Sequence, residues 1–377
     1  MLAPRATRVG LSLVVRRILF AGLLIGPLTI ALHYLADLDE TVEFVLAAIS
    51  LIPLAWLIGE ATEHAAEHTG PGIGGFLNAT FGNAPELIIA LLAVNQGLTE
   101  VVRGSLTGSV VGNLLLVLGF SLLFGPRGEV DRWSSFMSFA LIGVAIALFL
   151  VPSIPAWDGD PDRDAIVNLS VPISILLLVV YVVATFVSLR RHRDLHDPAE
   201  EAGHGTWTLG RALAVLGAAT VVTALVAEVL VGSLETFAER AGLSDFFVSA
   251  VIVAIVGNAA EHGGAVVVAH RGKVKLAAEI ALASAAQVAV FLIPAVTILS
   301  WLIDPLALGF REVEIAALAG GLAVTAVTLW GGHASKARGA VLVAAYVVVV
   351  VLFYAAGDRD GHSEAPSANA AGALVSG

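Results

Sequence analysis

Long apolar stretches separated by short polar ones run through almost the whole chain. Each holds about 20 residues, the length that an α-helix needs to cross a hydrocarbon layer of about 30 Å. Apolar blocks of this length predict membrane-spanning helices rather than the core of a soluble domain. The pattern predicts eleven spans, near residues 18–36, 41–59, 74–96, 100–124, 134–152, 166–189, 208–231, 245–269, 276–303, 312–331 and 338–356. We therefore expect an all-α polytopic membrane protein with about eleven transmembrane helices.

The polar breaks divide this pattern into five segments. Residues 190–207 form the only long polar break in the middle, and the last residues are polar or small, which is typical of disorder. The first apolar stretch could alternatively be a signal peptide, but it is long enough to span and no clear small-residue cleavage site follows it. The expected segments are an N-terminal segment with the first span (1–40), a first transporter half (41–189), a cytoplasmic linker (190–207), a second half (208–356) and a polar tail (357–377).

Composition supports the membrane class and excludes several functions. Hydrophobic residues make up 58% of the chain and charged residues 14%, against about 25% charged residues in soluble domains. The chain has no cysteine, which excludes disulfides and thiolate metal sites. The net charge of −11 argues against a nucleic-acid partner. No ATP-binding motif is present, and we expect neither an enzyme nor a resident cofactor.

Positive charge predicts the direction of the spans. With the N-terminus in the cytoplasm, only five of the 20 Lys and Arg fall on the outer side: Arg103, Arg163, Arg240, Arg311 and Arg359. The N-terminus is therefore expected inside and the C-terminus outside. Short loops and the lack of a transit peptide favour a bacterial cytoplasmic membrane, with the bilayer as the partner and the oligomeric state open.

Two short motifs repeat along the chain. The stretch "FGNAPELIIALLAV" begins at residue 81, and "VGNAAEHGGAVVVA" begins at residue 256. A single offset of 175 residues pairs Gly82 with Gly257, Asn83 with Asn258, Glu86 with Glu261, Ser109 with Ser284 and Glu60 with Glu235. This constant offset predicts two homologous halves of five spans each, and the first span belongs to neither half. Because five is odd, the halves would cross the membrane in opposite directions, as in the inverted repeats of secondary transporters.

The paired motifs predict a site for a hard cation near the middle of the membrane. Asn83 and Glu86 share one helix face, as do Asn258 and Glu261. Gly82 and Pro85 weaken the helix there and free carbonyl oxygens. Two carboxylates would offset the desolvation of a divalent ion, and without the ion they would tend to take protons. Competition between the cation and protons is the simplest basis for exchange.

The following spans add neutral polar groups to this site. The expected cation ligands are Glu86, Glu261, Asn83, Asn258, Ser109, Asn113, Ser284 and Gln287. Glu86 and Glu261 are also the expected proton carriers, and His262 could tune the charge of Glu261 or relay a proton. Glu60 and Glu235 are expected along an entry path.

Simpler explanations exist for several of these residues. A single intramembrane glutamate could be a structural hydrogen-bonding group, although two at matched positions argue against this. Gly108, Gly112, Ala283 and Ala286 could simply allow close helix packing, and the Ser105 and Thr107 hydroxyls are expected to bond within their own helix.

A zinc site is a further alternative. The letters "HAAEH" from His64 to His68 match the H-x-x-E-H pattern of some zinc peptidases. No acidic residue in a clear context supplies a third ligand, so we expect a polar helix extension or entrance instead.

The two signature regions resemble those of a known family. "LIGEATEHAAEHTGPGIGGFLNATFGNAPELIIALLAV" and "GLSDFFVSAVIVAIVGNAAEHGGAVVVA" are similar to the paired motifs of the calcium/proton exchanger (CAX) family, within the calcium/cation antiporter superfamily. The resemblance covers residues 42–355. Two features depart from the family pattern: His64 stands where a second glutamate is usual, and the central loop has only a short acidic stretch, at 197–201.

The resemblance implies eleven spans in two inverted halves, and extrusion or sequestration of cytosolic calcium driven by proton influx. It places the signature glutamates at Glu86 and Glu261. A sodium or potassium/proton antiporter of the same fold and a cation channel remain alternatives, distinguished by the dependence of the flux on the ion and on the pH gradient.

Overall fold

The computed structural model describes residues 13–193 and 207–359, and this part of the chain is almost entirely helical. In chain order the helices are α1 (Leu13–Gly22), α2 (Ile25–Leu35), α3 (Glu40–Gly82), α4 (Ala84–Asn95), α5 (Thr99–Val111), α6 (Leu118–Phe124), α7 (Arg132–Ala156), α8 (Asp164–Arg193), α9 (Leu209–Gly232), α10 (Leu234–Ala241), α11 (Asp245–Phe247), α12 (Ala254–Gly257), α13 (Ala259–His270), α14 (Val274–Gln287), α15 (Ile293–Ser300), α16 (Glu312–Thr328) and α17 (Lys336–Ala356). Three π-helical segments, η1 (Gly112–Val117), η2 (Val248–Val253) and η3 (Val288–Leu292), join α5 to α6, α11 to α12 and α14 to α15. Two short strands, β1 (Gly128–Glu129) and β2 (His333–Ala334), pair antiparallel.

Eight helical stretches in the described residues are long and apolar enough to cross a membrane. A ninth is added if Leu234–Ala241 and Asp245–Gly257, which meet at 111°, are counted as one broken span. The predicted spans at 74–96 and 245–269 are helical but broken at Asn83 and Asn258, and the span at 312–331 falls on α16, which has 17 residues. The helical membrane class is therefore confirmed, whereas the count of eleven spans is not.

Breaks and π-helical segments recur at corresponding places in the two halves. Asn83 separates α3 from α4 and Asn258 separates α12 from α13, 175 residues later, with φ/ψ of −102°/16° and −90°/3°. These angles lie in the sparsely populated bridge region, outside the α-helical range. The segment η1 follows α5, and η3 follows α14 in the same way. Matched residues thus adopt matched irregular backbone at these places, whereas η2 corresponds to residues 73–78, which are α-helical in α3.

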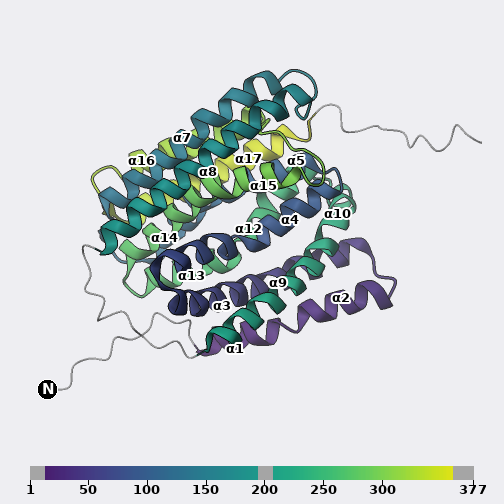
Figure 1. Ribbon diagram of the computed structural model, residues 1–377, viewed down its shortest axis with the longest axis horizontal. Coiled ribbons are helices and arrows are strands. Elements are labelled where there is room, and N and C mark those ends of the chain that lie inside the picture. The colour runs from purple at the N-terminus through teal and green to yellow at the C-terminus, as the bar shows by residue number, and fades with distance from the viewer. Residues whose placement is uncertain (1–12, 194–206, 360–377) are drawn as a thin grey trace, which may run out of the picture.

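The helices form two groups with a third set between them. Figure 1 shows α1, α2, α3 and α9 side by side along one side of the molecule, and α7, α8, α16 and α17 on the opposite side. The helices α4, α12 and α13 lie between these groups (Figure 1). The motif helices are therefore held in the middle of the molecule.

The long helix α3 is not straight. A Cβ on Gly74 would stand 3.0 Å from the Cβ of Ala66, eight residues earlier, although eight residues span about 12 Å along a straight helix. The chain therefore turns back sharply after the candidate span Glu40–Thr69. The returning part of α3 leads directly to Asn83.

Local sequence signals explain where several helices begin. The side chains of Asp39, Asp131, Thr208 and Ser335 accept backbone N–H groups at the starts of α3, α7, α9 and α17. Such caps satisfy N–H groups that have no partner within the helix. Gly242, with φ of 67°, ends α10 in the left-handed conformation that favours glycine.

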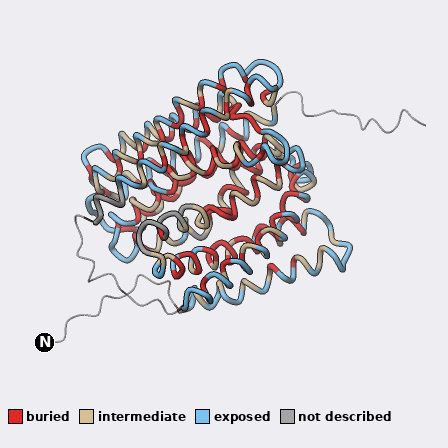
Figure 2. Tube along the Cα trace, in the orientation of Figure 1, coloured by how far each residue is buried: buried red, intermediate tan, exposed pale blue. Residues whose placement is uncertain are grey.

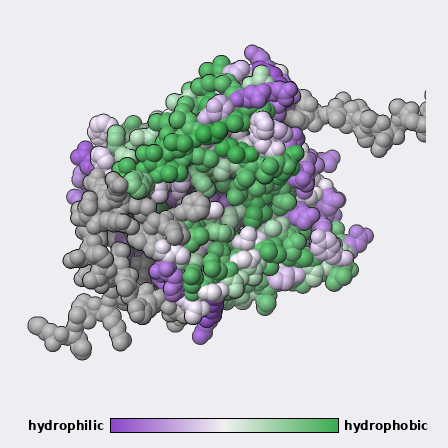
Figure 3. Space-filling view, in the orientation of Figure 1, coloured by the Kyte–Doolittle hydropathy of each residue, from purple (hydrophilic) through white to green (hydrophobic). Residues whose placement is uncertain are grey.

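The surface agrees with a bilayer environment. Buried residues line the middle of the helix bundle (Figure 2). On the face in view, apolar residues cover the centre while polar residues gather toward the two ends (Figure 3). Exposed tryptophans lie near helix ends, at Trp133, Trp157, Trp301 and Trp330, as in the aromatic belts at membrane interfaces.

Two predicted segments lie partly outside the described residues. The expected linker at 190–207 includes residues 194–206, and the expected tail at 357–377 includes residues 360–377, none of which the structure describes.

Candidate functional site

The two motif glutamates each lie against the glycine of the other motif. A Cβ on Gly257 would stand 3.4 Å from Cγ and 3.6 Å from Oε1 of Glu86. A Cβ on Gly82 would stand 3.5 Å from Oε1 of Glu261. Both carboxylates therefore enter one region, each beside the broken helix of the other half.

Two carboxylates and the carbonyl ends of two broken helices bring negative charge into this region. Gly82 is the last residue of α3, and Gly257 is the last residue of α12. The carbonyl end of a helix carries a partial negative charge and has unpaired carbonyl oxygens. Each carboxylate also lies in the first turn of its own helix, where a negative charge is stabilised. Two carboxylates and two helix ends together suit a cation.

Asn258 joins the two halves directly. Its Nδ2 donates to Oγ of Ser109 on α5, at 2.9 Å, and to the carbonyl of Ala254, at 2.9 Å. Ser109 in turn donates to the carbonyl of Ser105 at 2.9 Å, and Nδ2 of Asn113 donates to the carbonyl of Ser109 at 3.0 Å. All of these polar side chains are buried. Ser105 itself bonds within its own helix, as expected, at 3.0 Å to Val102.

The two matched serines have different partners. Ser284 donates to Oε2 of Glu261 at 2.6 Å, whereas Ser109 accepts from Asn258. Gln287 ends α14 and is half-buried, and Asn83 is buried at the end of α3. The site is thus built asymmetrically from symmetric sequence positions.

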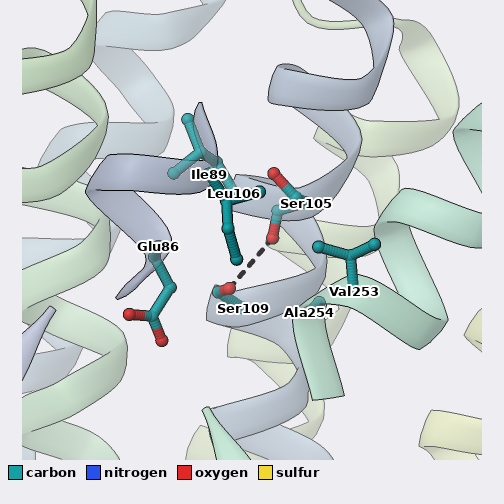
Figure 4. A pocket seen from close by; sticks show the side chains of 7 residues that line it. All are labelled: Glu86, Ile89, Ser105, Leu106, Ser109, Val253 and Ala254. Atoms are coloured by element: carbon teal, nitrogen blue, oxygen red, sulfur yellow. Dashed lines mark hydrogen bonds between the residues drawn. The ribbon is translucent and has the colours of Figure 1, made fainter. Parts of the chain in front are cut away.

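Two buried oxygens in this region have no hydrogen-bond partner among the described residues: Oε2 of Glu86 and Oδ1 of Asn258. An unsatisfied buried acceptor costs about 1–3 kcal/mol. Glu86 and Ser109 line a small pocket with Ser105, Ile89 and Val253 (Figure 4). Unsatisfied acceptors beside a pocket are what a cation would satisfy.

The remaining predicted residues lie around this centre or away from it. His262 is half-buried, its Nε2 has no partner among the described residues, and its Cε1 would be 4.0 Å from a Cβ on Gly112. Glu60 is half-buried and pairs with Arg16 of α1 at 2.6 Å. Glu235 is exposed on α10. The roles of these residues in proton coupling and ion entry stay predictions.

The histidines of the zinc alternative have other partners. Nε2 of His68 donates to the carbonyl of Trp207 at 2.8 Å. The ring of His64 packs on Trp207 with a centroid distance of 4.9 Å, and its Nδ1 lies 3.5 Å from Glu67. No group of three His, Asp or Glu suited to a metal occurs within residues 13–193 and 207–359. The arrangement favours a packed helix extension over a zinc centre.

Sequence reasoning missed a buried charged cluster on α5. Arg103 is 1% exposed and pairs with Glu100 at 2.8 Å and with Asp162 at 2.9 Å. Burial raises the pKa of Asp162, but the Arg103 guanidinium and hydrogen bonds from the Ala307 N–H and the Thr99 side chain together lower it by more, so the pKa lies below its ordinary value. The sequence did contain a signal for this cluster. Glu100 and Arg103 carry opposite charges three residues apart, at the start of a predicted span. This cluster ties α5 to the α7–α8 loop.

Thr107 also behaves differently from the expectation. Its hydroxyl donates to Oε1 of the fully buried Glu314 on α16, at 2.9 Å, and not to its own helix. Glu314 was not recognised from the sequence. Its second oxygen accepts the backbone N–H of Arg311 at 2.8 Å, so it also caps α16. Glu314 therefore links α16 to the helix that carries Ser109.

The centre as a whole offers two carboxylates and several neutral oxygens. This donor set fits a hard cation, which prefers oxygen ligands. The carboxylates need neutralising charge in a buried place, and either a cation or protons can supply it. The arrangement can therefore alternate between a cation-bound and a protonated form.

Comparison with known families identifies relatives for both halves. The model of a family described as sodium/calcium exchanger protein matches residues 40–190 and again residues 211–355. The Ca²⁺/H⁺ antiporter ChaA of Bacillus subtilis is 38% identical over 327 residues, which cover 84% of this chain and 92% of the antiporter. A Ca²⁺/H⁺ antiporter of Synechocystis sp. is 33% identical over 365 residues, covering 90% of this chain and 97% of the relative.

Solved structures of similar proteins also match this chain. The structure of native YfkE matches with a TM-score of 0.77 and 34% identity, over 89% of this chain and 99% of YfkE. The crystal structure of the H⁺/Ca²⁺ exchanger CAX matches with a TM-score of 0.69 over 90% of this chain and 91% of that one. Its identity of 17% supports the fold alone.

Proposed function

Because the chain belongs to the sodium/calcium exchanger family, we propose that it exchanges calcium for protons by secondary active transport. The observation that carries this proposal is the reciprocal placement of Glu86 beside Gly257 and of Glu261 beside Gly82. Relatives named Ca²⁺/H⁺ antiporters, which align over most of both chains, support calcium as the ion. The resemblance to calcium/proton exchangers read from the motifs is thereby confirmed.

Calcium binds between the two glutamates in this proposal. Glu86 and Glu261 supply the negative charge, and Asn83, Asn258, Ser109, Asn113, Ser284 and Gln287 supply neutral oxygens. When calcium leaves, protons neutralise the carboxylates, because an unpaired charge at this depth is costly. The calcium-bound form and the protonated form exclude each other. This exclusion couples the calcium flux to the proton flux.

In this proposal the chain crosses the membrane eleven times, and its two halves form an inverted repeat that moves the ion. Two separate matches to one family model, the matched breaks at Asn83 and Asn258, and the matched segments η1 and η3 support a repeat. The broken helices α3–α4 and α12–α13 each act as one span in this scheme. Alternating exposure of the site to each side then follows from exchange of conformation between the halves.

The proposed orientation places the N-terminus in the cytoplasm of a bacterium and the C-terminus outside. Bacterial relatives and the distribution of Lys and Arg support this placement. Glu60 would then lie toward the cytoplasm and Glu235 toward the outside, where each lines an entry path. His262 relays protons to Glu261.

Calcium uptake into inside-out vesicles with an acidic lumen tests the function. Uptake should depend on the pH gradient and fall at least about tenfold in Glu86→Gln, since the mutant lacks one of the two charges that offset calcium desolvation. Glu228→Gln, on an exposed position of α9, is the matched control and should keep its uptake.

Two results would contradict the proposal. Proton release from the vesicles on adding sodium or potassium, without calcium uptake, would mean a different ion at the same site. Calcium flux that ignores the pH gradient would mean a channel.

A further inference from the structure

Two helices beside the site carry matched stripes that differ in burial. On α5 the stripe is Gly104, Gly108 and Gly112, each four residues apart. The offset of 175 residues places Glu279, Ala283 and Gln287 at the same positions on α14. Positions four apart share one helix face. Each stripe runs alongside a site residue, Ser109 on α5 and Ser284 on α14.

The α5 stripe is closed by the other half of the molecule. A Cβ on Gly108 would overlap the carbonyl oxygen of Ala250 and stand 2.8 Å from the Cβ of Ala254. A Cβ on Gly104 would stand 3.1 Å from the ring of Phe246. All three glycines are buried. The helix α11–η2–α12 therefore lies directly on α5, at a distance that only glycine allows.

The α14 stripe is open. Ala283 is exposed, although its neighbours Leu282 and Ser284 are buried, and Gln287 is half-buried. Leu276, seven residues before Ala283 and on the same face, is 41% exposed. The helix face that is buried on α5 is therefore exposed at the matched position on α14.

Each face lies on the N-terminal side of its site serine, and the two faces point toward opposite sides of the membrane in the proposed orientation. Gly104 and Gly108 lie between Ser109 and the α4–α5 loop, residues 96–98. Ala283 lies between Ser284 and the α13–α14 loop, residues 271–273. In the proposed orientation the first loop is outside and the second is in the cytoplasm.

The helix that would close the open face is identified by the same offset. Residues 245–257, which form α11, η2 and α12, correspond to residues 70–82 at the end of α3. Both segments lead directly to a motif asparagine, Asn258 or Asn83. A conformational exchange between the halves would therefore place residues 70–82 on Ala283 and release residues 245–257 from Gly108.

We propose that the contact between Gly108 and Ala250 is the outer gate of the transporter, closed in this structure, and that the Ala283 face is the inner gate, open. This inference rests on the proposed function and adds to it the residues that control access. Gly108 is a positioning residue here: it lets η2 reach α5. The cluster of Arg103, Glu100 and Asp162 holds the outer end of α5 fixed against this contact.

Single-cysteine labelling tests the gates, and the natural chain has no cysteine to interfere. Ala283→Cys reports on the inner gate, and Ser105→Cys, in the pocket beside Glu86, reports on the outer one. With a membrane-impermeant maleimide, Ala283→Cys should react from the cytoplasmic side and Ser105→Cys should not react from outside. Adding Gly108→Ala should raise the reaction rate of Ser105→Cys and lower that of Ala283→Cys, each by about tenfold, because the methyl overpacks the closed state.

Two controls separate gating from other effects. Val179→Cys lies on the exposed face of α8 and should not react, since a lipid-facing thiol is out of reach of an aqueous reagent. Gly217→Ala on α9 makes the same chemical change where a Cβ meets nothing within 4 Å, and it should change neither rate. The fraction of each variant that remains folded is measured by size-exclusion chromatography in detergent.

The outcomes distinguish this inference from the proposed function. Labelling of Ala283→Cys no faster than that of Val179→Cys, or rates that Gly108→Ala leaves unchanged in folded protein, would overturn the gates even if calcium/proton exchange is measured. The expected shifts in labelling without calcium transport would support the gates and refute the choice of ion.

Discussion

Glu86 packs against Gly257, with 3.4 Å between its Cγ and the place that a Cβ on the glycine would take. These two residues come from different halves of the chain and from two broken helices, α4 and α12. The glycine leaves room beside a buried carboxylate, and its position at a helix end directs carbonyl oxygens toward the same region. Gly82 and Glu261 repeat this relationship with the halves exchanged.

Gly257→Ala is expected to weaken calcium binding without unfolding the protein. The new methyl group would be in ordinary van der Waals contact with Glu86, so the fold can accept it. It would place an apolar group where the ion needs oxygen, and we expect the KM for calcium to rise about tenfold. Calcium-dependent uptake in vesicles measures this. Gly232→Ala, with nothing within 4 Å of its Cβ, should leave the KM unchanged.

Ser284→Ala should affect the site more than Ser105→Ala. Ser284 donates to the carboxylate of Glu261 at 2.6 Å, whereas Ser105 bonds only a carbonyl of its own helix. Loss of a hydrogen bond to a charged group costs about 1.5–3 kcal/mol, which corresponds to a rise of at least about tenfold in the calcium KM. Equal KM values for the two variants would show that Ser284 does not orient Glu261.

Arg103→Met should lower stability strongly. The substitution leaves Asp162 without its guanidinium partner and leaves Glu100 with Arg359 alone, at 3.5 Å, and breaking a buried pair costs about 3–5 kcal/mol. Thermal unfolding in detergent measures the loss. The matched control is Lys275→Met, because the Lys275–Asp131 pair is exposed and such pairs contribute about 0–1 kcal/mol. Similar melting temperatures for both variants would contradict a stabilising role of the cluster.

Asp162 predicts a specific acid sensitivity. Its pKa is lower in the folded protein than its ordinary value of 3.8, so the folded state binds this proton less readily than the unfolded chain. The stabilisation is complete above the ordinary value and is lost as the pH falls through the lowered one. Asp162→Asn should remove this part of the acid destabilisation below about pH 4, measured as melting temperature against pH. An unchanged profile would show that Asp162 does not contribute.

The purified protein should contain no tightly bound zinc, and chelators should not change its melting temperature. His68 uses Nε2 to donate to Trp207, and His64 is packed on the same ring. Elemental analysis checks this. Stoichiometric zinc that disappears in His64→Asn would revive the peptidase alternative.

The sequence predicted the helices well and singled out the two motif glutamates, for identifiable reasons. Long apolar blocks report the bilayer directly, because every backbone group in lipid must be paired within a helix. Glu86 and Glu261 stood out because a carboxylate in such a block is costly and occurs twice at one offset. The broken backbone at Asn83 agrees with the weak helix expected from Gly82 and Pro85, and the break at Asn258 follows the matched Gly257.

The partners of the polar residues could not be predicted in this way. Ser109 and Ser284 occupy matched positions, yet one bonds Asn258 and the other bonds Glu261. Thr107 was expected to bond within its helix and instead donates to Glu314, 207 residues later. Such pairs depend on how distant helices rotate and cross, which local periodicity does not encode.

The membrane class, the repeated motifs, the two glutamates and the family could therefore all be identified before the structure was known. Those features follow from local hydrophobicity and from residues that recur at one fixed offset. The tertiary structure alone decided that each glutamate faces the other half's glycine, that Arg103 joins Asp162, and that Gly108 is sealed while Ala283 is exposed. The physical reason is that two halves with matched sequences can pack differently, and their contacts depend on the crossing of helices far apart in the chain.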